Sequence, residues 1–135
     1  MRLEGKSIVV TGASAGMGQA IVTRFVEEGA YVVAVARRKE RLEELAAELK
    51  DAPGKIAIYA GDVSDPATCE GMIDLAVKEF GRLDVLVNNA GIMDDNTAVG
   101  DMSDEMMEKM FKVNSFAPLY AMRKAVKVFL EQDDE

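Results

Sequence analysis

Thr11-Gly12-Ala13-Ser14-Ala15-Gly16-Met17-Gly18 is the stretch of this sequence that decides the fold. It follows an apolar run at residues 7–10, typical of a buried strand, and precedes residues with the apolar spacing of a helix. Glycines let the backbone turn sharply and approach a ligand, and a helix that begins there presents unpaired N–H groups to an anion. We therefore expect the linked phosphates of a dinucleotide to bind at this junction, with a merely glycine-rich turn as the alternative interpretation.

Short runs rich in valine and isoleucine alternate along the chain with longer charged stretches of helical periodicity. The runs at residues 7–10, 31–35, 56–59 and 85–87 predict four parallel strands buried on both faces, because they are apolar without alternating. Right-handed crossovers place these strands in the order 3-2-1-4, the first half of a doubly wound sheet. The whole chain, residues 1–135, is thus predicted as one incomplete Rossmann-like α/β domain in three layers, with helices on both faces of the sheet.

Capping and turn residues mark the ends of the predicted helices. Asp65 can cap the third helix while Pro66 occupies its first turn, where a missing N–H costs nothing. Gly81 is suited to end that helix. A fourth helix is expected to begin near Ser103, and Pro118 should bend or interrupt it.

Composition excludes several classes of function. The chain is 49% hydrophobic and 30% charged, as in an ordinary folded domain, and its net charge of -8 argues against binding to nucleic acid or an anionic membrane. It has no histidine, which rules out imidazole catalysis within these residues. Its single cysteine, Cys69, is predicted to be buried among apolar residues. No signal peptide or membrane-spanning run is recognised, so a cytoplasmic location is expected.

The glycine stretch resembles the Thr-Gly-x-x-x-Gly-x-Gly signature of the short-chain dehydrogenases/reductases. Three further matches follow in the same order: Asp62-Val63, Asn88-Asn89-Ala90-Gly91 and Asn114. The resemblance implies the dinucleotide-binding half of an enzyme that moves hydride between a nicotinamide and a small carbonyl or alcohol substrate. It implies Asn114 as the catalytic residue present, no metal site, and these cofactor-binding residues: Gly12, Ser14, Ala15, Gly16, Met17, Gly18, Arg37, Arg38, Asp62, Val63, Asn89, Ala90 and Gly91.

Each of these positions also has a physical reason to bind a ligand. In open parallel sheets ligands bind beyond the carboxyl ends of the strands, where these residues are expected to fall. Asp62 can accept a hydrogen bond from the adenine amino group while Val63 packs on the ring. Asn88 and Asn89 can pair backbone groups at the chain crossing, and Ala90 with Gly91 should approach the nicotinamide side.

The end of the second strand favours NADP(H), with NAD(H) as the alternative cofactor. An enzyme that prefers NAD places an acidic residue there, but this chain has Ala36 followed by Arg37 and Arg38. An arginine can pair with the additional phosphate of NADP and stack on adenine. The alternative is a solvated basic start to the next helix. Ala15 departs from the pattern, because many NADP-using relatives have a basic residue there.

Other suggestive features are given structural interpretations. Tyr120 and Lys124 have the spacing of the family's catalytic Tyr-x-x-x-Lys, but they follow Asn114 too closely and are not expected to be catalytic. A cluster of methionines between Met93 and Met110 could line a substrate cleft, although packing or a subunit contact is favoured. Residues 94–96 and the acidic end at 131–135 are interpreted as a polar turn and a solvated terminus.

Enzymes that the sequence resembles are about twice as long, so the chain is expected to be a truncated or partial form that is inactive alone. Its fourth strand would then present an unpaired edge, which predicts a homo-oligomer or pairing with a missing C-terminal half. A non-catalytic module that binds NADP(H) or serves as an interaction surface is the alternative function.

Overall fold

Four parallel strands form the sheet at the centre of the computed structural model, which describes residues 1–94 and 96–132. The strands are β1 (Ser7–Thr11), β2 (Tyr31–Ala36), β3 (Lys55–Ala60) and β4 (Val85–Val87), in the order β3-β2-β1-β4. This confirms the predicted doubly wound α/β topology. Expectations for Asp95 and residues 133–135 lie outside the described residues.

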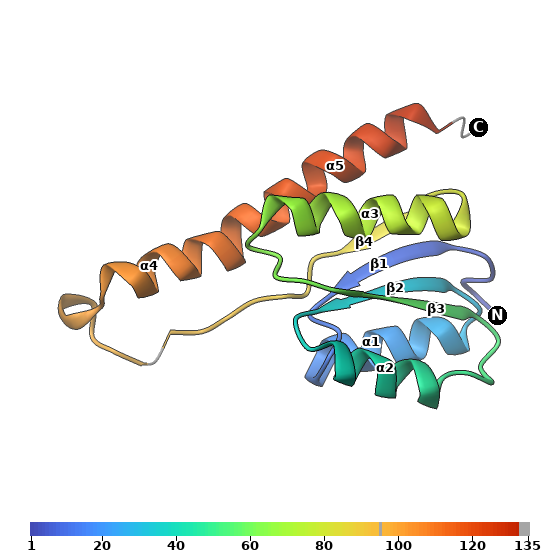
Figure 1. Ribbon diagram of the computed structural model, residues 1–135, viewed down its shortest axis with the longest axis horizontal. Coiled ribbons are helices and arrows are strands. Elements are labelled where there is room, and N and C mark those ends of the chain that lie inside the picture. Colours follow the sequence, from blue (N-terminus) through green and yellow to red (C-terminus); the bar gives the residue numbers. More distant parts are fainter. Residues whose placement is uncertain (95, 133–135) are drawn as a thin grey trace.

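Helices cover the sheet on both faces, which gives three layers (Figure 1). α1 (Gly16–Glu27) and α2 (Lys39–Glu48) lie on one face, and α3 (Pro66–Phe80) and α5 (Ala117–Glu131) lie on the other. After β4 the chain passes through a short 3-10 turn, η1 (Val99–Asp101), to α4 (Asp104–Phe111). Figure 1 shows α4 beyond the sheet, continuous in direction with α5.

The central strand β1 supplies side chains to two separate cores, because successive residues of a strand point to opposite faces. Ile8 and Val10 pack with the α1 and α2 side, whereas Val9 packs with the α3 and α5 side. Cys69 belongs to the second core and is fully buried, which confirms its predicted packing role. Burial raises the pKa of its thiol.

The two edge strands are less buried than the sequence predicts. Residues Ile56 to Tyr59 of β3 are only half-buried, and Val85 at the start of β4 is 37% exposed. An edge strand has a neighbour on one side only, so apolar side chains there keep contact with solvent. The prediction of burial on both faces holds for β1 and β2 and is wrong for β3 and β4.

Helix ends follow the predicted capping chemistry. The Asp65 carboxylate accepts a hydrogen bond from the Ala67 N–H at 3.0 Å, and Gly81 adopts φ 80 at the end of α3. Ser103 caps α4 by accepting from the Met106 N–H at 3.1 Å. These contacts confirm the predicted starts of α3 and α4.

The expected interruption at Pro118 is a π-helical turn, η2 (Lys112–Phe116), between α4 and α5. Pro118 has no N–H to donate to the carbonyl of Asn114, four residues earlier, as an α-helix would require. The Ala117 N–H instead bonds to the carbonyl of Lys112, five residues earlier. This turn contains Asn114. None of the helices in the described residues is long and apolar enough to cross a membrane.

A single carboxamide joins the end of α5 to the segment just before β4. Gln132 accepts from the Leu83 N–H at 2.6 Å and donates to the Leu83 carbonyl at 2.8 Å. Leu83 is fully buried, so these two backbone groups have little access to water when the pair is broken.

Replacing Gln132→Ala should therefore lower the free energy of unfolding by about 2 kcal/mol, because two partly buried backbone groups lose their partners. Urea denaturation followed by circular dichroism measures the change. The neighbouring exposed Glu131→Ala is the matched control and should remain near the wild-type value. Equal midpoints for the Gln132 and Glu131 variants would show that this clamp adds nothing to stability.

Candidate functional site

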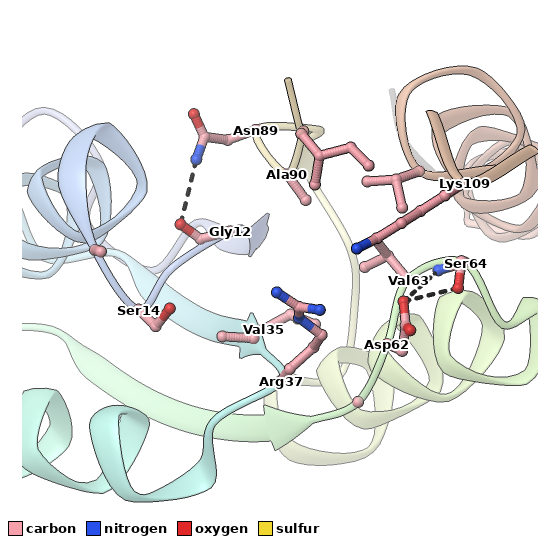
Figure 2. A pocket seen from close by; sticks show the side chains of 16 residues that line it. Gly12, Ser14, Val35, Arg37, Asp62, Val63, Ser64, Asn89, Ala90 and Lys109 are labelled. Atoms are coloured by element: carbon pink, nitrogen blue, oxygen red, sulfur yellow. Dashed lines mark hydrogen bonds between the residues drawn. The ribbon is translucent and has the colours of Figure 1, made fainter. Parts of the chain in front are cut away.

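A cavity of about 340 Å³ opens at the carboxyl ends of the four strands. Nine of the residues predicted from the sequence line it: Gly12, Ser14, Ala15, Arg37, Asp62, Val63, Asn89, Ala90 and Gly91. They come from the loops that follow β1, β2, β3 and β4, as the rule for ligand sites in open parallel sheets requires. Figure 2 shows the loops meeting around this cavity.

Thr11 joins the loop after β4 to the end of β1. Its buried hydroxyl accepts hydrogen bonds from the Asn89 N–H at 3.1 Å and the Ala90 N–H at 3.0 Å, and donates to the Val87 carbonyl at 3.4 Å. The Asn89 side chain adds a bond to the Gly12 carbonyl at 3.3 Å (Figure 2). Asn89 therefore pairs backbone groups as predicted, whereas Asn88 lies exposed to solvent.

Two glycines of the turn are required by close contacts. A Cβ on Gly18 would lie 1.8 Å from the Gly12 carbonyl oxygen, and a Cβ on Gly12 would lie 2.8 Å from Nδ2 of Asn89. Gly12 and Gly16 also have positive φ, at 66 and 58. The chain can cross itself at this point only because these side chains are absent.

The N-terminus of α1 has no side-chain cap. Ala15 occupies the N-cap position and offers no acceptor, whereas Asp65 and Ser103 cap α3 and α4. Gly16 and Met17, in the first turn, are exposed. The first N–H groups of α1 therefore remain free of a side-chain acceptor, beside the cavity wall formed by Ser14 and Ala15.

Asp62 forms a local turn with Ser64 on the β3 side of the cavity. Its Oδ1 accepts from the Ser64 N–H at 2.9 Å and from the Ser64 hydroxyl at 2.8 Å. The backbone hydrogen bond is the largest cause that lowers the pKa of the Asp62 carboxyl; partial burial opposes it, and the hydroxyl and the charges of Arg37 and Lys109 act with it. With its pKa lowered in the fold, Asp62 is an ionised acceptor at neutral pH. The stabilisation that its hydrogen bonds give to the fold is lost as the pH falls through its folded-state pKa.

The two arginines after β2 occupy different positions. Ala36 ends β2 and is only 8% exposed, and Arg37 follows as a lining residue whose guanidinium points into the cavity (Figure 2). Arg38 is the exposed N-cap of α2 and lies outside the cavity lining. Of the two basic residues that the sequence offered, Arg37 alone is placed beside the site.

Asn114 faces the loop after β4 from the π turn. Its Oδ1 accepts from the Ile92 N–H at 2.8 Å, and its Nδ2 donates to the Ile92 carbonyl at 2.8 Å. A Cβ on Gly91 would lie 3.3 Å from that Oδ1. Asn114 does not line the cavity itself, but it holds Ile92, which does.

Comparison with known proteins gives this arrangement a family. A profile described as short chain dehydrogenase matches residues 6–134. The chain belongs to the short-chain dehydrogenase family. It is 41% identical over 132 residues to 3beta-hydroxysteroid dehydrogenase 2 from Eggerthella lenta, which covers 98% of this chain and 51% of that protein.

Solved short-chain dehydrogenases share the fold. A metagenomic short-chain oxidoreductase in complex with NADP superposes with a TM-score of 0.90 at 32% identity, covering 96% of this chain and 59% of the other. L-Sorbose reductase from Gluconobacter frateurii, complexed with NADPH and L-sorbose, gives 0.87 at 34% identity, covering 93% and 48%. The chain thus spans about half the length of the relatives that it matches.

The Tyr-x-x-x-Lys spacing in this member of the family lies away from the cavity. The Tyr120 ring packs against Phe116, with centroids 6.4 Å apart, and the Lys124 ammonium is 3.1 Å from the Asp74 carboxylate of α3. Tyr120 therefore contributes to packing, and Lys124 joins α5 to α3 through an ion pair. The methionines between Met93 and Met110 do not line the cavity either. In the part of the chain that the structure describes, no cluster of three potential metal ligands occurs.

Sequence reasoning missed several lining residues, among them Ser64, Ile92, Lys109 and Val113. Ser64 had a usable signal, because an aspartate two residues before a serine commonly closes a local turn. Lys109 and Val113 are four positions apart, on one side of a helix, just before Asn114. Their approach to the cavity depends on the path of the loop after β4, which carries no such pattern.

Replacing Gly18→Ala should push α1 away from the loop of Gly12 and lower the free energy of unfolding by roughly 2 kcal/mol or more. Thermal and urea unfolding measure the loss. Gly100→Ala is the control, since a Cβ there meets nothing within 4 Å. A Gly18 variant as stable as the Gly100 variant would mean that the crossing tolerates a side chain.

Proposed function

We propose that this chain binds NADP(H) in the cavity as the cofactor-binding half of an oxidoreductase that acts on a small carbonyl or alcohol substrate. The observation that carries the proposal is the convergence, at one end of the sheet, of an uncapped helix N-terminus with the side chains of Arg37 and Asp62. The NADP and NADPH complexes of the two structural relatives support the choice of cofactor.

The glycine turn fits a pyrophosphate. The free N–H groups at the start of α1 can donate to phosphate oxygens, and the positive end of the helix dipole favours the negative charge. Gly16 leaves open space where a side chain would stand, since a Cβ there meets nothing within 4 Å. Gly12, Ser14, Ala15, Met17 and Gly18 complete this turn.

The other wall of the cavity fits an adenosine carrying a 2′-phosphate. Arg37 can form a charge-assisted pair with that phosphate, and Ala36 leaves no carboxylate to repel it. Asp62 can accept from the adenine amino group, and Val63 can pack on the ring. Arg38 stands one residue farther and contributes positive charge. NAD(H), which lacks the phosphate, binds more weakly in this proposal.

When bound, the nicotinamide supplies or accepts a hydride. Ala90 and Gly91 form the wall of the cavity that is left for that ring, and Asn114 fixes this wall through its two bonds to Ile92. Asn114 is the one residue of the family's catalytic set assigned in these 135 residues, and in this proposal its two bonds to Ile92 give it a positioning role. We therefore expect the 135-residue chain by itself not to turn over substrate.

Cofactor choice is tested by titrating NADPH and NADH into wild type and Arg37→Asp, following the fluorescence of the reduced nicotinamide. The variant should lose roughly tenfold to a hundredfold in NADPH affinity, because a charge-assisted pair is removed, and little in NADH affinity. Arg41→Asp changes the charge equally on exposed α2 outside the cavity and should bind as wild type. An unchanged preference in the Arg37 variant would refute its assignment.

The edge of β4 is expected to recruit a partner. β4 lies at the edge of the described sheet, with half-buried apolar residues, and such an edge can pair with a second copy or with a further segment of the enzyme. Size-exclusion chromatography with light scattering should show self-association, and a stable monomer would contradict this expectation.

An NADPH-dependent carbonyl reduction assay on the 135-residue chain should show no turnover. Measurable turnover would contradict the expectation that this chain is inactive by itself. Cofactor binding without turnover after pairing with a complementing segment would favour a non-catalytic binding module.

A further inference from the structure

The helical wall of the cavity contributes one cation, Lys109, to which the proposed function assigns no role. Lys109 on α4 and Val113 on η2 both line the cavity, four residues apart. Figure 2 shows the Lys109 side chain reaching from α4 towards the loop that carries Asp62 and Val63. Within the described residues, its ammonium makes no hydrogen bond or ion pair, so three donors remain for a ligand.

The charges that line the cavity are few and unlike those of the chain as a whole. They are Arg37, Asp62 and Lys109, two cations around one carboxylate, in a chain whose net charge is -8. Arg37 and Lys109 are close enough to Asp62 for both charges to lower its pKa. Lys109 thus belongs electrostatically to the Asp62 side of the cavity.

We infer that Lys109 reads the adenine base of the cofactor, donating a hydrogen bond to a ring nitrogen beside the amino group that Asp62 accepts from. The inference rests on the proposed function and adds a specificity-determining residue to it. Lys109 is then the donor, and Asp62 the acceptor, of a two-point contact with one base.

The chemistry of adenine suits such a pair. Its amino group is a donor, and the adjoining ring nitrogen N7 is an acceptor, so an acceptor and a donor side by side match it. Asp62 can only accept when ionised, and Lys109 can only donate. A base with a carbonyl in place of the amino group would present its oxygen to the Asp62 carboxylate and be disfavoured.

Geometry separates this role from phosphate binding. The residues proposed for the phosphates, Ser14 and Arg37, stand on the β1 and β2 side of the cavity, whereas Lys109 approaches from α4 over Val63 (Figure 2). A base that packs on Val63 therefore lies between the phosphate groups and α4. Its edge then faces the side from which Lys109 approaches.

The experiment titrates NADPH and NADH separately into wild type, Lys109→Met, Lys109→Arg and Lys112→Met. Methionine keeps an unbranched stem and removes the donor and the charge. Lys112→Met removes the same charge from the adjoining turn at an exposed position outside the cavity, and should bind as wild type. Circular dichroism and thermal unfolding check that each variant is folded.

Lys109→Met should weaken NADPH and NADH by the same factor, about fivefold, because adenine is common to both. Lys109→Arg should recover part of the loss. The factor should persist between about 50 mM and about 500 mM salt, since a bond to a neutral base is screened far less than a contact with phosphate. Adenosine 2′,5′-bisphosphate, which lacks the nicotinamide half, should show the same loss.

Three outcomes overturn the inference. Unchanged affinities in Lys109→Met would make Lys109 a solvated surface residue. A loss confined to NADPH would make it a second cation for the 2′-phosphate, and a loss that disappears at high salt would make it a pyrophosphate contact. Failure of the proposed function looks different, because wild type would then bind neither NADPH nor NADH.

Discussion

The hydroxyl of Thr11 is the junction on which the candidate site depends. β1 and β4 are far apart in sequence, and one buried oxygen at the end of β1 receives two N–H groups from the loop after β4. Backbone groups at such a crossing would otherwise be buried without partners. The junction brings Asn89 over Gly12, which in turn excludes any side chain at Gly12 and Gly18. The glycine turn is therefore shaped by its contact with the loop after the fourth strand.

The charges around the cavity differ in sign from the charge of the chain as a whole. The local positive elements are the N-terminus of α1, Arg37 and Lys109, and each comes from a different segment of the fold. None requires a basic surface elsewhere, and the net charge of -8 discourages nonspecific binding to phosphate polymers. Asp62 lies close enough to Arg37 and Lys109 for both charges to lower the pKa of its carboxyl, after the larger effect of its backbone hydrogen bond from Ser64.

How much the sequence could predict follows from how local each signal is. The strands and the cap at Asp65 depend on neighbours in the chain, so residue pattern was sufficient to predict them. The partial exposure of β3 and β4 depends on which strands end at the edges, and apolar runs alone do not carry that information. Arg37 lines the cavity and Arg38 does not, and Lys109 reaches the cavity from another helix. Both facts depend on where α2 and α4 lie in space, which the residue pattern does not show.

β4 has three residues, all paired with β1, and further contacts hold the chain on either side of it. Before it, Gln132 pairs with both backbone groups of Leu83; after it, Asn114 pairs in the same way with Ile92. Each carboxamide presents a donor and an acceptor side by side, as a neighbouring strand would, but from a helix. Because one continuous helical segment carries both, the position of α5 over the sheet and the position of the cavity wall at Ile92 are set together. The π turn in this segment contains Asn114, the residue that makes one of these two contacts.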